Sequence, residues 1–249
     1  MTDTSGIRPR HKLLDSLRGL TLLSMALYHG AWDLVYLFGV RWSWYRAFPG
    51  FVWQQSICWS FILLSGFCWP LGRHPLKRGL IVFGAGALVS AVTLLAMPEQ
   101  RILLGILTFL GSAMLLMIPL EKPLRRVPAL PGLVGAGLLF ALTYRLPDGL
   151  LGIGRWAIPL PGALYRGYGA AFLGFPPDNF FSTDYFPLLP WLFLFAAGYF
   201  LCRLLMKPDR QLPTAFTKGI RPLSFLGRHS LLLYLGHQPL IYGLLSLLF

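Results

Sequence analysis

The sequence predicts an all-α polytopic integral membrane protein, a helical bundle of about seven transmembrane helices. Of its 249 residues, 55% are hydrophobic and 12% are charged, whereas soluble domains have roughly 45–50% and about 25%. The apolar residues gather into runs of about 17–27, which is the length a helix needs to cross a hydrocarbon core of about 30 Å. Because these runs lack the period-two alternation of a β-barrel, each is expected to be a helix with its backbone groups paired internally.

The predicted spans cover residues 13–38, 51–71, 80–97, 102–120, 129–146, 187–206 and 223–249. With the N-terminus in the cytoplasm and the C-terminus outside, 16 of the 22 Lys and Arg residues fall on the cytoplasmic side and six on the other. This distribution agrees with the positive-inside rule. The basic start followed by an apolar run resembles a signal peptide, but the run is too long and too polar, so it is expected to remain as the first span.

The connection 147–186 on the predicted outer side is unlike the others, because it is long and rich in Gly, Pro and aromatic residues. Long loops are usually functional or disordered, and the apolar aromatic content argues against disorder. We expect this loop to lie on the bundle or to dip into it; the alternative is an aromatic segment at the membrane interface. Since no internal repeat is present, residues 1–249 are predicted to form a single transmembrane domain.

Composition also excludes two classes of protein. The formal net charge is +13, but the cations are scattered among short loops rather than clustered with stacking aromatics, so no nucleic-acid partner is expected. Cys58, Cys68 and Cys202 are odd in number and lie in apolar runs. They are therefore interpreted as small buried hydrophobes, and no metal site is implied.

The first span carries Asp15, Arg18, His29 and Asp33 in an otherwise apolar helix. At about 100° per residue, these four positions fall on one narrow stripe of the helix. Ionisable residues within spans are costly and nearly always face the bundle interior or a water-filled cavity. The stripe is therefore predicted to line a polar cavity.

Two pairs stand out within this stripe. His29 and Asp33 are four residues apart, so the carboxylate could hold one imidazole nitrogen and leave the other free as a base. Alternatively, His29 only hydrogen-bonds a neighbouring helix, with Asp33 at the interface. Asp15 and Arg18 lie one turn apart, which favours an internal ion pair that anchors the helix, although Arg18 could also meet an anion.

The last span contains the second polar cluster, GRHSLLLYLGHQPL. Arg228 lies near its predicted cytoplasmic mouth. His237 falls near mid-membrane, just before Pro239, whose missing N–H frees a carbonyl in the preceding turn. That carbonyl or a facing helix would satisfy the imidazole if it has no chemical role. Asp184 precedes the sixth span, where a helix cap is favoured over an acid at the outer mouth.

Five segments together resemble a known family: LLDSLRGLTLLSMALYHGAWDL, FILLSGF, GILTFLGSAMLL, DYFPLLPW and LGRHSLLLYLGHQPL. Their order and spacing are similar to the membrane family of the heparan-α-glucosaminide N-acetyltransferase catalytic domain, which is related to the integral membrane acyltransferase-3 group. The resemblance implies acyl transfer across the bilayer. The donor would be cytoplasmic acetyl-CoA, and the acceptor would be an amine or hydroxyl of an extracytoplasmic sugar or glycan.

The resemblance also implies roles for particular residues. The first-span histidine of the family matches His29, and its acidic and basic pair matches Asp15 and Arg18. The final histidine matches His237, and the acid before P-L-L-P-W matches Asp184. These residues are predicted to form the catalytic and substrate-binding site.

A mechanism follows from these roles. His29 would take a proton from the acceptor as it attacks the thioester, and Asp33 would stabilise the resulting imidazolium. His237 would donate to the developing oxyanion or position the thioester carbonyl. Arg18 and Arg228 are the cations closest to the predicted cytoplasmic mouth, so they are expected to hold the phosphates of CoA.

Two rival interpretations remain at this point. A proton-coupled transporter or flippase could use the same polar stripe, although such proteins usually show paired repeats or broken helices that this sequence lacks. A non-catalytic membrane partner is suggested by Thr108 alone, since many relatives carry His there. The expected home is a prokaryotic plasma membrane, where the bare helix faces would allow a homodimer.

Overall fold

The computed structural model describes residues 10–207 and 211–249. Residues 1–9 and 208–210, which belong to the predicted cytoplasmic arm and connection, lie outside the described residues. The described chain forms two compact units, one from residues 10–61 with 205–249 and the other from residues 62–204. Helices dominate both, as the sequence predicted.

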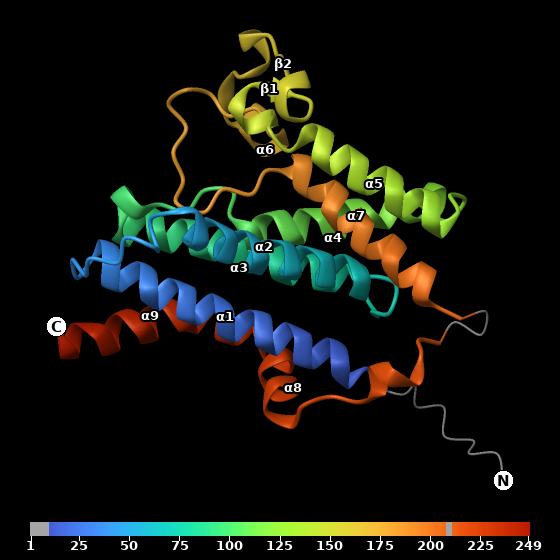
Figure 1. The fold of residues 1–249 in the computed structure, drawn as a ribbon, viewed down its shortest axis with the longest axis horizontal. Helices are drawn as coiled ribbons and strands as arrows, with labels where there is room; N and C mark the ends of the chain where they lie inside the picture. Colours follow the sequence, from blue (N-terminus) through green and yellow to red (C-terminus); the bar gives the residue numbers. More distant parts are fainter. Residues whose placement is uncertain (1–9, 208–210) are drawn as a thin grey trace. The chain divides into compact units, whose positions relative to one another are not determined.

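The first unit is built on α1 (Lys12–Tyr36), which packs along α8 (Arg221–Arg228) and α9 (Ser230–Leu248) (Figure 1). The short helix η5 (Thr214–Thr217) and the first part of α2 (Phe48–Cys68) complete it. Glycines allow the close approach of α1 and α8. A Cβ atom on Gly227 would lie 1.8 Å from the Asp15 carbonyl oxygen, and one on Gly19 would lie 2.0 Å from the Leu223 carbonyl oxygen.

The second unit contains the rest of α2 and four further elements: α3 (Pro75–Ala96), α4 (Ile106–Leu124), α5 (Ala129–Thr143) and most of α7 (Leu188–Leu205). A short helix, η1 (Pro98–Gln100), follows α3. Close helix contacts again rely on glycine. A Cβ atom on Gly86 of α3 would lie 2.5 Å from the backbone nitrogen of Thr108 on α4, and one on Gly198 of α7 would lie 2.2 Å from the carbonyl oxygen of Leu63 on α2.

The long loop has local structure of its own. Its elements are η2 (Leu146–Asp148), β1 (Leu150–Leu151), η3 (Gly154–Trp156), β2 (Ile158–Pro159), η4 (Gly162–Leu164) and α6 (Gly167–Leu173). Strands β1 and β2 pair antiparallel. Farther along, the Thr183 N–H donates to the Arg101 carbonyl and the Phe186 N–H to the Leu104 carbonyl. The loop therefore lies on its own unit, against the segment that leads into α4, in agreement with the prediction.

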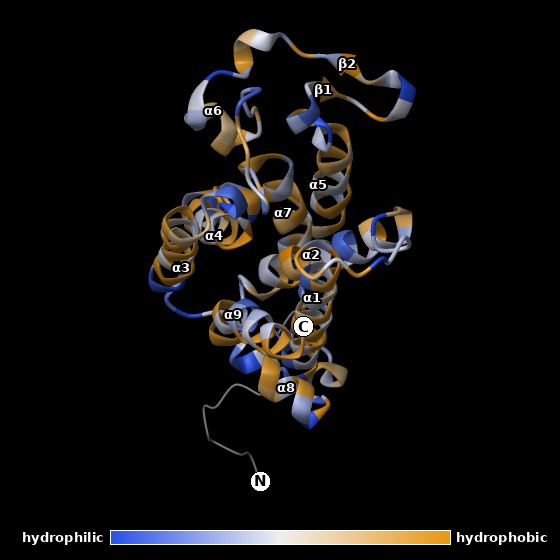
Figure 2. Ribbon diagram, turned by 90° about the vertical axis from the view of Figure 1, so that its left-hand side faces the viewer, coloured by the Kyte–Doolittle hydropathy of each residue, from blue (hydrophilic) through white to orange (hydrophobic). Residues whose placement is uncertain are grey.

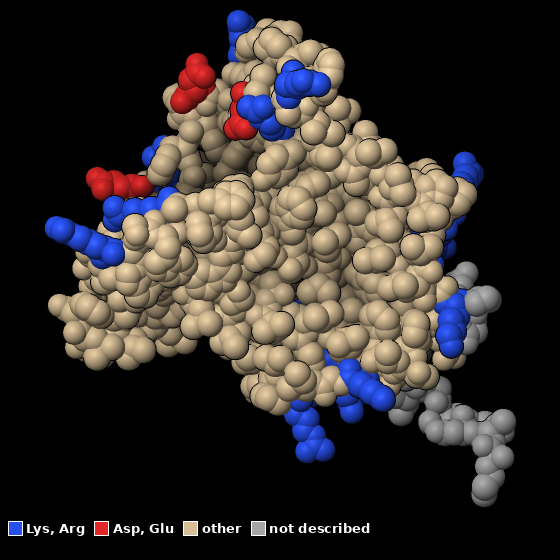
Figure 3. Space-filling view, in the orientation of Figure 1, with Lys and Arg blue, Asp and Glu red and all other residues tan. Residues whose placement is uncertain are grey.

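Within the described residues, six helices are long and apolar enough to cross a membrane: α2, α3, α4, α5 with the turn after it, α7 and α9. Their ribbons are largely apolar in Figure 2, and the face drawn in Figure 3 shows few charged side chains over the helices. The chain is therefore an integral membrane protein. Helix α1 is 25 residues long, which is sufficient to span, but its polar stripe keeps it out of this set, so the seventh span stays a prediction.

Most element boundaries lie within four residues of the predicted ones, although α3 begins at Pro75, five residues before the predicted start. Two further differences have a structural cause. The predicted last span, 223–249, is two helices separated at His229, whose N–H donates to the Leu226 carbonyl in a tight turn. A break here lets α8 present Ser224 and Gly227 to α1 while α9 takes another direction. Helix α4 begins at Ile106, four residues later than predicted, because the preceding residues are hydrogen-bonded to the long loop.

Candidate active site

Four polar side chains of the first unit meet between α1 and α9, and we call them the imidazole cluster: His29, Asp33, His237 and Gln238. His29 and Asp33 lie one turn apart on α1, whereas His237 and Gln238 are neighbours on α9. The His237 Nε2 atom lies 2.9 Å from His29 Nδ1, and the two ring centroids are 4.8 Å apart. The structure thus brings together the three residues predicted to be catalytic.

The hydrogen bonds of this cluster fix the positions of its protons. His237 Nδ1 bonds the Tyr234 carbonyl, and because a carbonyl only accepts, this nitrogen carries the proton. In a neutral ring His237 Nε2 is then an acceptor, so the bond between the two rings requires a proton on His29 Nδ1. His29 Nε2 is left with a free lone pair, and it has no hydrogen-bond partner among the described residues.

Gln238 connects His29 to Asp33. Its Nε2 atom donates to Asp33 Oδ1 over 2.7 Å, and its Oε1 atom lies 3.2 Å from His29 Nδ1. The prediction that Asp33 holds His29 directly was therefore wrong. Both side chains project from the same face of α1, and α9 places the Gln238 amide between them. Gln238 was not among the predicted residues, although its place beside His237 was a usable indication.

Asp33 is fully buried, with 0% of its surface exposed. Its Oδ2 atom has no hydrogen-bond partner in the described part of the chain. A buried carboxylate oxygen without a partner is unfavourable in free energy and is uncommon in structural positions. Asp33 is therefore a candidate for a role beyond packing between helices.

The proline in α9 has a different effect from the one predicted. Pro239 lacks the N–H that would bond the Leu235 carbonyl, but His237 uses the Tyr234 carbonyl instead. Its second nitrogen faces His29 on α1. The expectation of a facing helix as partner is confirmed, and the expectation of the carbonyl freed by proline is wrong.

Aromatic side chains pack around this part of α1. Tyr28 contacts Trp53 edge to face at 5.3 Å between centroids and Tyr45 at 5.1 Å. The Tyr45 hydroxyl donates to the Tyr28 carbonyl over 3.1 Å, and the Trp53 indole N–H donates to the Ser24 hydroxyl over 2.8 Å. These contacts fix the helix that carries His29.

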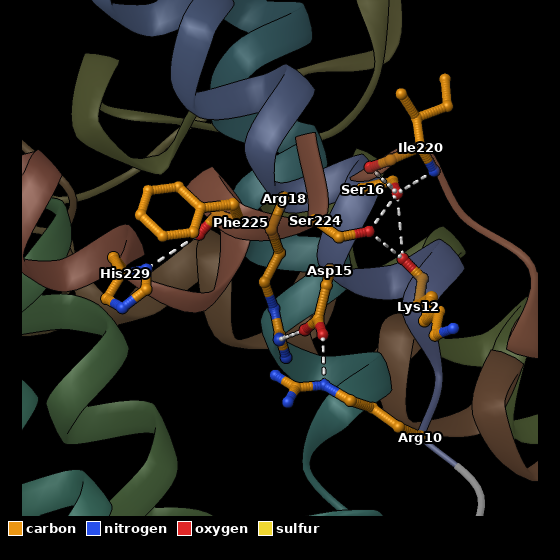
Figure 4. Close-up of polar contacts among 9 residues, drawn as sticks. All are labelled: Arg10, Lys12, Asp15, Ser16, Arg18, Ile220, Ser224, Phe225 and His229. Carbon is orange, nitrogen blue, oxygen red and sulfur yellow. Dashed lines mark hydrogen bonds and ion pairs between the residues drawn. The ribbon is translucent and has the colours of Figure 1, made fainter. Parts of the chain in front are cut away.

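A second polar group lies at the start of α1, and we call it the Asp15 cluster (Figure 4). Asp15 Oδ2 accepts from Arg10 Nε over 3.1 Å, and Asp15 Oδ1 accepts from Arg18 Nη1 over 3.3 Å. Beside it, the hydroxyls of Ser16 on α1 and Ser224 on α8 lie 2.8 Å apart. The predicted ion pair between Asp15 and Arg18 is confirmed, and Arg10 is a further partner.

Arg228, the last residue of α8, differs from Arg18 in exposure and in pairing. Its side chain is exposed, and within the described ranges it has no hydrogen bond or ion pair. Arg18, by contrast, is partly buried and already engaged by Asp15. Of the two predicted phosphate-binding arginines, Arg228 is therefore the one whose charge is uncommitted.

Asp184 belongs to the second unit, where it caps a different helix from the one expected. Its Oδ2 atom accepts the Ile106 N–H over 3.0 Å at the start of α4, whereas the sequence pointed to the sixth span, α7. Burial of the carboxylate raises the pKa of Asp184 to about 6, although the Ile106 N–H acts in the opposite direction. A helix N-terminus favours a negative charge, but here the loss of solvent outweighs that effect.

A comparison of the sequence with known families decides the broader assignment. The sequence model of the family "Heparan-alpha-glucosaminide N-acetyltransferase, catalytic" matches residues 10–239. The chain belongs to this family. No curated protein and no solved structure matches it.

The heparan-α-glucosaminide N-acetyltransferase match runs from before α1 to Pro239, so it contains both polar clusters and Asp184. It makes the chain a membrane protein of acetyltransferase type. The departure at Thr108 lies in the second unit, where the residue is buried on α4 against Gly86 of α3.

Cys58, Cys68 and Cys202 are buried, and no disulfide joins them within the described residues. Among the described residues no group of three His, Cys, Asp or Glu side chains is placed to hold a metal ion.

Proposed function

We propose that the protein is an acyl-CoA-dependent transmembrane acyltransferase. It moves an acetyl group from cytoplasmic acetyl-CoA to an amine or hydroxyl of an extracytoplasmic sugar or glycan. The observation that carries this proposal is the free lone pair on His29 Nε2, in a chain of the N-acetyltransferase family. A neutral imidazole with one unprotonated nitrogen is the group that general-base catalysis requires.

In the proposed reaction, His29 Nε2 takes up one proton and later returns it. The acceptor nitrogen or oxygen attacks the thioester carbonyl and gives its proton to His29 Nε2. The C–S bond breaks as the tetrahedral adduct collapses, and the CoA sulfur takes the proton back from the imidazolium. The product is the acetylated sugar and free CoA thiol, with the imidazole restored.

His237 and Asp33 are assigned two different supporting roles. Both nitrogens of His237 are used, one by Tyr234 and the other by His29, so we assign His237 to supporting the base rather than to the oxyanion. The negative charge of Asp33 offsets the positive charge of the imidazolium, although the Gln238 amide lies between the two side chains. Lost solvation at this site makes such charge compensation stronger than it would be in water.

The donor requires cations for its phosphates. Arg228 is exposed and uncommitted at the end of α8, and Arg18 lies at the start of α1 with one of its guanidinium nitrogens on Asp15. The proposed orientation, with the N-terminus in the cytoplasm, places both arginines on the acetyl-CoA side. Asp184 is proposed to lie at the acceptor side.

The experiment that tests this function uses the purified protein in liposomes with radiolabelled acetyl-CoA outside and amino sugars or glycan fragments inside. Label recovered on the enclosed sugar supports acyl transfer. Release of unmodified sugar without label on any product would instead support the transporter alternative, for which the half-paired Asp33 would be a proton site. Liposomes with the protein in the opposite orientation provide the control for sidedness.

A further inference from the structure

We propose that Gln238 is a positioning residue. Asp33 holds the amide nitrogen of Gln238, so the amide oxygen faces His29 as a hydrogen-bond acceptor. It holds the His29 proton on Nδ1 and so keeps Nε2 free as the base. This inference rests on the proposed function, but its central claim, the position of one proton, can be measured without any turnover.

The two ends of the Gln238 amide differ in hydrogen-bonding character, since the nitrogen donates and the oxygen accepts. A carboxylate oxygen can only accept a hydrogen bond, so the Gln238 group at 2.7 Å from Asp33 Oδ1 must be the NH2. The amide oxygen is then necessarily the end that faces His29 Nδ1, at 3.2 Å. Turning the amide over would set its oxygen against the carboxylate and its NH2 against the proton on His29 Nδ1. Both contacts would be repulsive.

A second, independent contact requires the same proton position. His237 Nε2 is an acceptor because the other nitrogen of that ring donates to the Tyr234 carbonyl. Two acceptors, one from each of two adjacent residues on α9, therefore share the single N–H of His29.

The arrangement predicts an exchange experiment. In Gln238→Glu, two carboxyl groups face each other in place of the bond between Gln238 and Asp33, which disrupts the cluster. In Asp33→Asn, the side chain can donate as well as accept, so the orientation of Gln238 is no longer enforced. In the double variant, the new amide at position 33 donates to the new carboxylate at position 238, which in turn accepts the His29 N–H. The double variant therefore has the same order of donors and acceptors as the parent, but its negative charge lies at position 238 instead of position 33.

The test measures kcat, the KM for acetyl-CoA and the acceptor KM for the parent, both single variants and the double variant. Gln238→Glu should lose about a hundredfold in kcat, and Asp33→Asn about tenfold, while the KM for acetyl-CoA stays within about twofold. The double variant should recover to within about tenfold of the parent. Gln100→Glu and Asp148→Asn, alone and together, change the same residue types outside the cluster and serve as controls.

The second readout is ¹⁵N NMR of histidine-labelled protein in nanodiscs, which distinguishes a protonated from an unprotonated ring nitrogen. We expect His29 with a proton on Nδ1 in the parent and in the double variant. In Asp33→Asn the Nδ1-protonated fraction should be lower, because His237 Nε2 is then the one acceptor still held in place. A double variant as inactive as Gln238→Glu, or a His29 proton on Nε2 in the parent, would overturn the inference. If the parent transfers no acetyl group but the NMR result holds, the proposed function fails and the positioning by Gln238 stands.

Discussion

Helix α1 carries two carboxylates on the same face, Asp15 and Asp33, in very different surroundings. Both oxygens of Asp15 are bonded to guanidinium groups, from Arg10 and Arg18. Only one oxygen of Asp33 is bonded, by an amide, and the side chain is fully buried. A carboxylate with both oxygens bonded to guanidinium groups holds a helix in place. We propose that the partly satisfied carboxylate, connected through Gln238 to an imidazole with a free lone pair, marks the site of the chemistry.

The contrast extends to the helices that cover the two clusters. Near Asp15, α8 packs so closely that glycine is required at the contact, and serine hydroxyls bond between the helices. Near Asp33, the contact with α9 is made by the polar side chains of His237 and Gln238. Changes at the first cluster should therefore act on stability, and changes at the second on rate.

The largest expected effect is at the imidazole cluster. His29→Ala should reduce acetyl transfer by at least two orders of magnitude, because a positioned general base contributes typically about 10²–10⁴-fold. Folding should survive, since water can take the place of an imidazole in a polar site. The measurement is the initial rate in proteoliposomes, together with the elution profile of the protein in detergent.

His74→Asn is the matched control for this change, because it removes an exposed imidazole at the start of α3 and keeps a residue that tolerates the left-handed backbone there, with φ of 54°. Its rate should equal that of the parent. Near-normal transfer by His29→Ala would make the imidazole cluster structural and remove the contrast between the two regions.

The Asp15 cluster should respond in stability. In Gly227→Ala, the added methyl group would lie 1.8 Å from the Asp15 carbonyl oxygen, so α1 and α8 must move apart at a cost of about 1–3 kcal/mol. The melting temperature in detergent, followed by tryptophan fluorescence, should fall. Gly243→Ala on α9 has no atom within 4 Å of the new methyl group and should be neutral or slightly stabilising. Equal melting temperatures for the two variants would contradict close packing at this contact.

Arg18 and Arg228 should differ in how much each contributes to acyl-CoA binding. Arg228→Ala should weaken acyl-CoA binding by about ten- to a hundredfold, because charge-assisted hydrogen bonds contribute roughly 1.5–3 kcal/mol. Arg18→Ala should weaken it less, since Asp15 already engages that guanidinium. Equilibrium binding of a non-hydrolysable acyl-CoA measures both, with Arg155→Ala as control. Unchanged affinity in both variants would assign the two arginines to structure alone.

In the second unit, the expected effect is on the pH dependence of stability, and it comes from Asp184. Its pKa is about 6 in the folded chain against an ordinary value of 3.8, so between these values the folded state binds more protons than the unfolded state. Stability should therefore fall as pH rises from about 4 to about 6 and then level off.

Asp184→Asn keeps an oxygen that can accept the Ile106 N–H but carries no charge. The stability difference between this variant and the parent should grow as the pH rises through that range. At neutral pH the variant should be more stable by about 1–3 kcal/mol, since one pKa unit corresponds to about 1.4 kcal/mol. Melting temperatures at pH 4, 5, 6 and 7 measure this. A constant difference at all four values would show that the charge is not responsible. An increase in the sugar KM would support the predicted role of Asp184 in acceptor binding.

The sequence by itself determined the membrane class, the helical bundle, the family and the polar stripe of α1. These follow from composition, run length, motif order and the 3.6-residue period, which are properties of the chain alone. The ion pair of Asp15 with Arg18 was also predictable, because its partners are three residues apart on one helix.

Only the tertiary structure decided which groups meet across helices. The His29–His237 contact and the bridging amide of Gln238 join residues more than 200 positions apart, and helical spacing says nothing about the rotation of α9 against α1. The break at His229 and the capping of α4 by Asp184 depend in the same way on distant partners, Ser224 packing on Ser16 and the Ile106 N–H. Hydrogen bonds need donor and acceptor within about 3 Å, and that distance is set by packing, not by sequence position.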